Sequence, residues 1–143
     1  MKKLLFTALL SILSLSFANA QAYNGNGDQQ VSVGLVPWGY GTGITAMYDY
    51  GISDLISVGG GGEFYFGGKD DHDNFYIFGR ANVHLGDVLD MPSNMDLYPG
   101  LDIGFNSGLG LGAHLGFRYL FNDNFGAYIE AGSRGSLGVF IKL

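Results

Sequence analysis

Several residue types are scarce or absent, and each absence removes a class of protein. The 143-residue chain contains no Cys, which excludes disulfide bonds, thiol chemistry and lipid attachment through an N-terminal Cys. Charged residues make up only 14% of the chain, and there is one Trp. Beyond residue 20 no segment shows an apolar stripe at helical spacing, so the sequence predicts no helix there. Stability must therefore come from packing or from lipid.

Basic residues are also few. Without Lys2 and Lys3, which lie in the first 20 residues, the seven basic residues become five against 13 acidic ones, a net charge of −8. A chain with this balance is not expected to bind nucleic acid or an anionic membrane leaflet.

The first 20 residues have the pattern of a cleavable export signal. Lys2 and Lys3 form a positive start, residues 4–17 form an apolar run, and Ala18 to Ala20 form a small-residue cleavage pattern. The alternative is an uncleaved membrane helix, but the run is shorter than the ~20 residues that such a helix needs. We predict a signal peptide over 1–20 and, from its Asn and Gly content, a flexible lead-in over 21–29.

The whole chain combines 25 Gly with 21 aromatic residues (11 Phe, 9 Tyr and 1 Trp), and all but Phe6 and Phe17 lie beyond residue 20. Apolar and polar residues alternate in eight short segments, which predicts strands. These segments cover residues 30–38, 42–51, 55–67, 74–86, 95–106, 109–121, 125–133 and 136–143. The short connections predict hairpins, and an even strand number lets the first and last strands meet. We predict an all-β, eight-stranded antiparallel up-and-down barrel over residues 30–143.

The alternation separates the strand residues into two faces. One face carries no charge and presents about thirty large apolar side chains, too many for the interior of eight strands. We therefore predict a transmembrane barrel with the apolar face toward lipid and a narrow polar lumen. The predicted lumen network contains Asp49, Glu63, Arg80, His84, Asp102, His114, Arg118, Glu130 and Lys142. Neighbouring strands suggest the ion pairs Glu63 with Arg80, Arg118 with Glu130, and Glu130 with Lys142.

Aromatic residues gather near the strand ends, where large rings favour a membrane interface. The pattern predicts an outer girdle and an inner girdle. The outer girdle contains Phe64, Phe66, Phe75 and Phe105, and the inner one contains Tyr50, Tyr119, Phe121 and Phe125.

Two segments, Tyr50 to Gly59 and Tyr119 to Gly132, resemble the strand-turn-strand units of small Gram-negative outer-membrane β-barrels, the group that includes OmpA-type and OmpW-type proteins. The resemblance covers essentially the whole mature chain. It implies location in the outer membrane, contact with its lipid, and insertion by the outer-membrane assembly machinery, which reads an alternating last strand ending in an aromatic residue. Leu137, Val139 and Ile141 supply the alternation, whereas the final Leu143 departs from the pattern.

Several residues invite a chemical interpretation. The lumen network suggests acid–base or transport chemistry, but interior polar groups need partners whatever the function, which favours a buried ion-pair network. His84 and His114 lie on the fourth and sixth strands, so we expect hydrogen bonds and not a shared metal. The loop from Lys69 to Asn74 offers carboxylates for a cation but lacks the features of an EF-hand, and a solvated loop is favoured.

A hydrolase site is not expected either. Ser32, Ser57 and Ser136 face the predicted lumen, and none has an evident His at its level. We assign no catalytic residue, cofactor or metal.

Three classes of function follow. The leading one is a non-enzymatic outer-membrane barrel with a structural or accessory envelope role. The second is a passive, porin-like conduit for small solutes, which a side-chain-filled lumen disfavours. The third is a soluble secreted barrel that binds a lipophilic ligand, which would need the opposite arrangement of faces. The sequence leaves the oligomeric state open.

Overall fold

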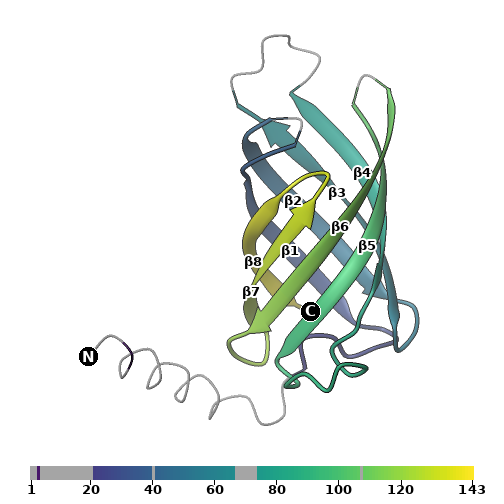
Figure 1. Ribbon diagram of the computed structural model, residues 1–143, viewed down its shortest axis with the longest axis vertical. Helices are drawn as coiled ribbons and strands as arrows, with labels where there is room; N and C mark the ends of the chain where they lie inside the picture. The colour runs from purple at the N-terminus through teal and green to yellow at the C-terminus, as the bar shows by residue number, and fades with distance from the viewer. Residues whose placement is uncertain (1–2, 4–20, 40, 67–73, 107) are drawn as a thin grey trace.

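The protein is a closed barrel of eight antiparallel strands (Figure 1). The computed structural model describes residues 3, 21–39, 41–66, 74–106 and 108–143. The strands are β1 (Gln29–Val36), β2 (Gly43–Gly51), β3 (Ile56–Tyr65), β4 (Phe75–Val83), β5 (Met95–Phe105), β6 (Leu109–Leu120), β7 (Phe125–Gly132) and β8 (Ser136–Lys142). Within the described residues, none of the chain forms a helix long and apolar enough to cross a membrane.

The predicted architecture is confirmed, because each strand pairs with the next and β1 closes the barrel against β8. The closing register places Gln30 opposite Lys142 and Leu35 opposite Leu137. The predicted strand ends are close to the observed ones, and the largest difference is in β4. The prediction extended this strand to residue 86, but it ends at Val83 because the chain then turns at Gly86 and Asp87 before β5.

The two ends of the barrel differ. The lower end, as drawn in Figure 1, carries the connections 52–55, 84–94 and 121–124, together with the C-terminus and the segment before β1. The upper end carries the other three connections and the β7–β8 turn. Residues 67–73, which include most of the predicted acidic loop from Lys69 to Asn74, lie outside the described residues.

Tyrosine rings and charged groups fill the interior. Tyr76 and Tyr98 are almost fully buried, and they occupy space that only Gly leaves free on the facing strands. A Cβ on Gly104 would lie 2.2 Å from the Tyr76 ring, and one on Gly116 would lie 2.2 Å from the Tyr98 ring. The interior also takes in apolar side chains that the sequence analysis did not place there: Val36, Met47, Phe78, Leu120 and Phe140.

The outer surface is apolar. Leu101, Leu109 and Leu111 are 69%, 74% and 80% exposed. They belong to a large apolar surface and are not single apolar residues scattered among polar ones. The aromatic residues predicted as girdles stand at the two ends of the strands. Those at the upper end are at least half exposed, namely Phe64, Phe66, Phe75 and Phe105. At the lower end Tyr50 and Phe125 are more exposed than Tyr119 and Phe121.

Candidate functional site

The strongest candidate site is the interior itself, where all nine residues of the predicted lumen network are buried. At its centre the Arg80 guanidinium bridges two carboxylates. It donates to Asp49 at 2.6 and 2.9 Å and to Glu130 at 2.7 and 3.0 Å. Arg118 donates to the same Asp49 at 2.9 Å and stacks 4.2 Å over the Tyr98 ring. Charge-assisted, bidentate contacts of this kind are among the strongest hydrogen bonds in proteins.

The predicted ion pairs need correction, because the structure joins different partners. Arg80 on β4 reaches β2 and β7, and Arg118 on β6 reaches β2. Sequence neighbours in the sheet were the wrong guide, because a long side chain in a narrow barrel crosses the axis. Lys142, expected to pair with Glu130, instead lies 2.7 Å from Asp28.

Arg134 organises the upper end, and the sequence analysis did not identify it. It pairs with Glu63, lies 3.5 Å from Asp102, and stacks 4.5 Å above the rings of Tyr76 and Phe78. Arg134 lies in the β7–β8 turn, where strand alternation assigns no face, so no sequence signal directed it inward.

At the lower end, residues 21–28 lie across the mouth of the barrel. Lys142 donates to the Gln21 carbonyl at 2.6 Å, and Gln30 donates to the Ala22 carbonyl at 2.6 Å. The Tyr23 ring stacks on His84 at a centroid distance of 3.6 Å. Burial raises the pKa of Tyr23 to about 12. These contacts fix where the segment lies; its flexibility stays a prediction.

A Ser-His-Asp sequence of hydrogen bonds lies beside this mouth. The Ser57 hydroxyl is 2.7 Å from His84 Nε2, and His84 Nδ1 contacts Asp96. The expectation that Ser57 has no His at its level is therefore wrong. It failed because Asn82, and not His84, stands opposite Ser57 in the sheet, and the side chain of His84, the next inward residue, reaches back to Ser57.

This arrangement does not have the surroundings of a hydrolase site. Ser57 is 1% exposed, and its oxygen accepts a hydrogen bond from Asn82 at 3.2 Å. The neighbouring cavity measures about 10 Å³, which is the room of one water molecule. Burial lowers the pKa of His84, against the opposing effect of Asp96. The three side chains form part of the interior network and leave no space for a substrate.

His114 makes a second set of hydrogen bonds further up the barrel. Its Nδ1 is 2.9 Å from Asp102, and its Nε2 is 2.7 Å from the Asn82 side-chain oxygen. Within the described ranges, no cluster of three or more His, Cys, Asp or Glu side chains is arranged to hold a metal ion. Both histidines are hydrogen-bonded, as the sequence analysis expected.

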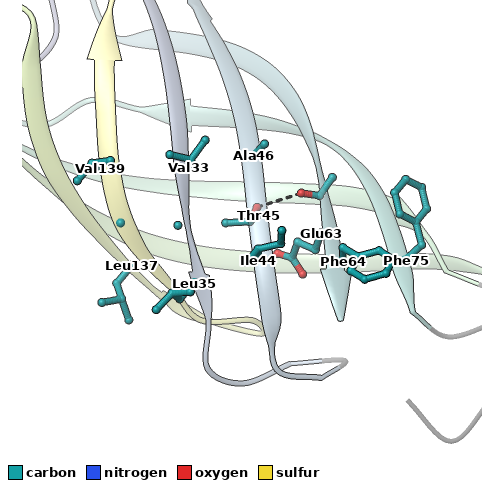
Figure 2. Close-up of a pocket in the computed structure, with 13 residues that line it drawn as sticks. Val33, Leu35, Ile44, Thr45, Ala46, Glu63, Phe64, Phe75, Leu137 and Val139 are labelled. Carbon is teal, nitrogen blue, oxygen red and sulfur yellow. Dashed lines mark hydrogen bonds between the residues drawn. The ribbon is translucent and has the colours of Figure 1, made fainter. Parts of the chain in front are cut away.

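Cavities differ sharply between inside and outside. A second interior cavity, lined by Glu63, Asp102 and Glu130 among others, also measures about 10 Å³. By contrast, the outer wall carries an apolar groove of about 680 Å³. Figure 2 shows it between Leu137 and Val139 on one side and Phe64 and Phe75 on the other, with Ala46 between them.

Comparison with known proteins identifies a family and a fold. The sequence profile of a family described as a family of unknown function (DUF6646) matches residues 13–135. The chain is also similar to a solved structure described as "De novo design of transmembrane beta-barrels". The two share 13% sequence identity with a TM-score of 0.66, over 84% of this chain and 98% of that one. No curated protein matches the chain.

Proposed function

The chain belongs to this family of unknown function, and we propose that it is an integral outer-membrane β-barrel with a non-enzymatic, structural or accessory role in the Gram-negative envelope. Residues 1–20 act as its export signal in this proposal. The mature chain contacts outer-membrane lipid and is inserted by the outer-membrane assembly machinery.

One observation carries the proposal: the wall has an apolar exterior around a charged, sealed interior. Leu101 and Leu111 are 69% and 80% exposed, whereas Arg80 and Glu130 are 5% and 6% exposed. In water this arrangement is unfavourable, because large apolar surfaces stay hydrated while charges lose their hydration. In a bilayer the same arrangement is favourable, because lipid covers the apolar wall and the barrel satisfies its own backbone hydrogen bonds.

A solute conduit is the second candidate, and the interior argues against it. The central Arg80, Asp49 and Glu130 bridge the axis with hydrogen bonds of 2.6 to 3.0 Å. The cavities beside His84 and beside His114 each have room for about one water. We therefore expect no conductance above background when the purified protein is added to a planar bilayer.

A soluble barrel that binds a lipophilic ligand is the third candidate. Such a protein needs an apolar interior large enough for its ligand, of roughly 300 Å³ or more. A groove of that size, about 680 Å³, lies on the outside of β1–β4 and β8. The interior cavities are polar and about 10 Å³ each.

Membrane fractionation combined with surface proteolysis tests the proposal. The full chain is expressed in a Gram-negative host, the envelope is washed with alkaline carbonate, and intact cells are treated with trypsin. We expect the mature chain to begin at Gln21, to remain in the outer-membrane fraction and to migrate differently on a gel before and after heating. External trypsin should cut once, after Lys69.

The Lys69→Gln variant is the matched control, and it should resist the external protease while fractionating identically. Recovery of the mature chain in the aqueous periplasmic or secreted fraction without detergent would overturn the membrane proposal and favour the soluble barrel. Cleavage only after the outer membrane is broken would reverse the orientation.

A further inference from the structure

A chain of hydrogen bonds connects the two interior histidines. It runs from Asp96 to His84, Ser57, Asn82 and His114, and ends at Asp102. Between the two rings the distances are 2.7 Å from His84 Nε2 to Ser57, 3.2 Å from Ser57 to Asn82, and 2.7 Å from Asn82 to His114 Nε2. Every member is at least 93% buried, so the chain of hydrogen bonds is shielded from bulk solvent.

The Nδ1 atom of each ring must donate a hydrogen bond. His84 Nδ1 faces Asp96, and His114 Nδ1 faces Asp102. Asp96 also accepts a hydrogen bond from the Gly86 backbone N–H at 3.0 Å. An ionised carboxylate only accepts hydrogen bonds, so both Nδ1 atoms carry a hydrogen. The charge of each ring then depends on whether its Nε2 also carries one.

The orientation of the Asn82 side-chain amide decides whether the Nε2 atom of each ring carries a hydrogen. Its oxygen faces His114 Nε2, and its nitrogen donates to the Ser57 hydroxyl oxygen. His114 Nε2 must therefore donate, which makes this ring an imidazolium. The Ser57 hydroxyl donates its own hydrogen to His84 Nε2. This nitrogen therefore carries no hydrogen, and the His84 ring is neutral. Burial lowers the pKa of His84, which favours that form.

No other number of protons satisfies the chain. With no extra proton, both Nε2 atoms need a donor. Asn82 must then turn its nitrogen toward His114, while Ser57 donates its hydrogen to His84. The Asn82 oxygen and the Ser57 oxygen are left facing each other with no hydrogen between them. With two, both rings donate inward, and the Ser57 hydroxyl is left without an acceptor among the described residues. An unmatched buried polar group costs about 1–3 kcal/mol. The opposite orientation of Asn82 also holds one proton, but moves it to His84.

We propose that His84 and His114 form one proton-binding site, which holds a single proton that rests on His114. The charges facing it agree with proton uptake. The described residues place six carboxylates inside the barrel against four Arg or Lys cations: Asp28, Asp49, Glu63, Asp96, Asp102 and Glu130 against Arg80, Arg118, Arg134 and Lys142. One imidazolium halves the resulting excess of two negative charges.

The groups around the two rings come from several strands. Tyr23 and Tyr98 face His84 with ring centroids at 3.6 and 5.7 Å, and Tyr98 lies 6.2 Å from His114. Arg134 lies 3.5 Å from Asp102, and Arg118 stacks on Tyr98. His114, Glu63 and Glu130 all line the second interior cavity. These carboxylates balance the positive ring.

Gly100 makes room for the contact that holds the proton. A Cβ at this position would lie 2.4 Å from His114 Nε2 and 2.5 Å from the Asn82 oxygen. Glycine therefore lets the ring and the amide meet beside the wall.

Nuclear magnetic resonance of the ¹⁵N-histidine-labelled full chain, folded in detergent micelles at pH 7, tests the proposal directly. Long-range ¹H–¹⁵N spectra distinguish a ring with two protonated nitrogens from a ring with one, and the His72→Gln variant identifies the third histidine. We expect one charged ring, His114, and one neutral ring, His84, with its hydrogen on Nδ1. Two neutral rings, two charged rings, or a charge on His84 would each overturn the proposal.

Two variants sharpen this test. Asn82→Asp replaces the amide with a carboxylate that accepts from both sides, so the number of charged rings should rise from one to two; a count that stays at one contradicts the proposed role of Asn82. Gly100→Ala should abolish the charged His114 signal. Its matched control is Gly79→Ala, whose Cβ meets nothing closer than 3.8 Å and which should leave the spectrum unchanged.

Discussion

The inner and outer faces of the barrel wall come from the same eight strands, yet their glycines stand in opposite situations. On the inner face, a Cβ at Gly104 or Gly116 would lie 2.2 Å from a tyrosine ring. On the outer face, a Cβ at Gly62 would meet nothing closer than 3.6 Å, and one at Gly79 nothing closer than 3.8 Å. Close contacts of protein atoms therefore constrain these two inner positions and not these two outer ones.

This difference indicates which contacts determine the residue types on each face. Inside, each side chain is fixed by a neighbour, as Asp49 is by Arg80 and Arg118. Outside, exposed residues such as Leu101 and Ile77 point away from the interior. Their apolar character is therefore determined by the medium that surrounds the barrel. In the membrane location that we propose, those surroundings are hydrocarbon.

The largest effect is expected from breaking the inner network. Asp49→Ala removes the carboxylate that both Arg80 and Arg118 contact, and it leaves buried positive charge without a partner. We expect a loss of about 3–5 kcal/mol in the free energy of unfolding, measured by urea titration of the protein folded in lipid vesicles. Asp123→Ala, on an exposed turn, is the matched control and should change little. Equal stabilities for the two variants would show that the network does not hold the barrel together.

A charge on the outer face separates a membrane barrel from an aqueous one. Leu101 lies mid-wall and Leu109 at the upper strand end, and both are exposed. In a bilayer, Leu101→Arg should cost about 2–4 kcal/mol, and Leu109→Arg about 0–1 kcal/mol, because the penalty falls toward the interface. The same vesicle titration measures both. If neither variant loses stability, hydrocarbon does not surround this wall.

The smallest expected effect compares glycines on the two faces. Gly138→Ala would bring a Cβ to 2.1 Å from the Val33 carbonyl oxygen and 2.4 Å from the Gly34 Cα. Backbone has to move, at a cost of about 1–3 kcal/mol. Gly62→Ala would make only ordinary van der Waals contacts, at 3.6 Å or more, and should be neutral or slightly stabilising. Stabilities that differ in the opposite order would contradict the contrast drawn between the faces.

The sequence predicted strands and faces well because both depend on a local period of two residues. The same period places Asp96 and Tyr98 inward, on either side of Leu97, although the sequence analysis overlooked them. The partners inside were harder. Glu63 and Arg80 lie on adjacent strands, but Tyr76 stands opposite Glu63, and Arg80 pairs with Gly59. Adjacency of strands therefore did not bring these charges together.

The alternation of residues determined the eight strands and the inward position of every charged strand residue, because both follow from neighbours two residues apart. The short connections determined the antiparallel order. Only the closed barrel decided which charges meet. Closure brings β2, β4 and β7 within reach of one guanidinium and lets the turn residue Arg134 fold inward. The contacts of Arg80 and Arg134 cross the axis, and their geometry exists only once the first and last strands have paired. The packing of β3 to β6 along one side of the wall aligns His84 and His114 through Asn82.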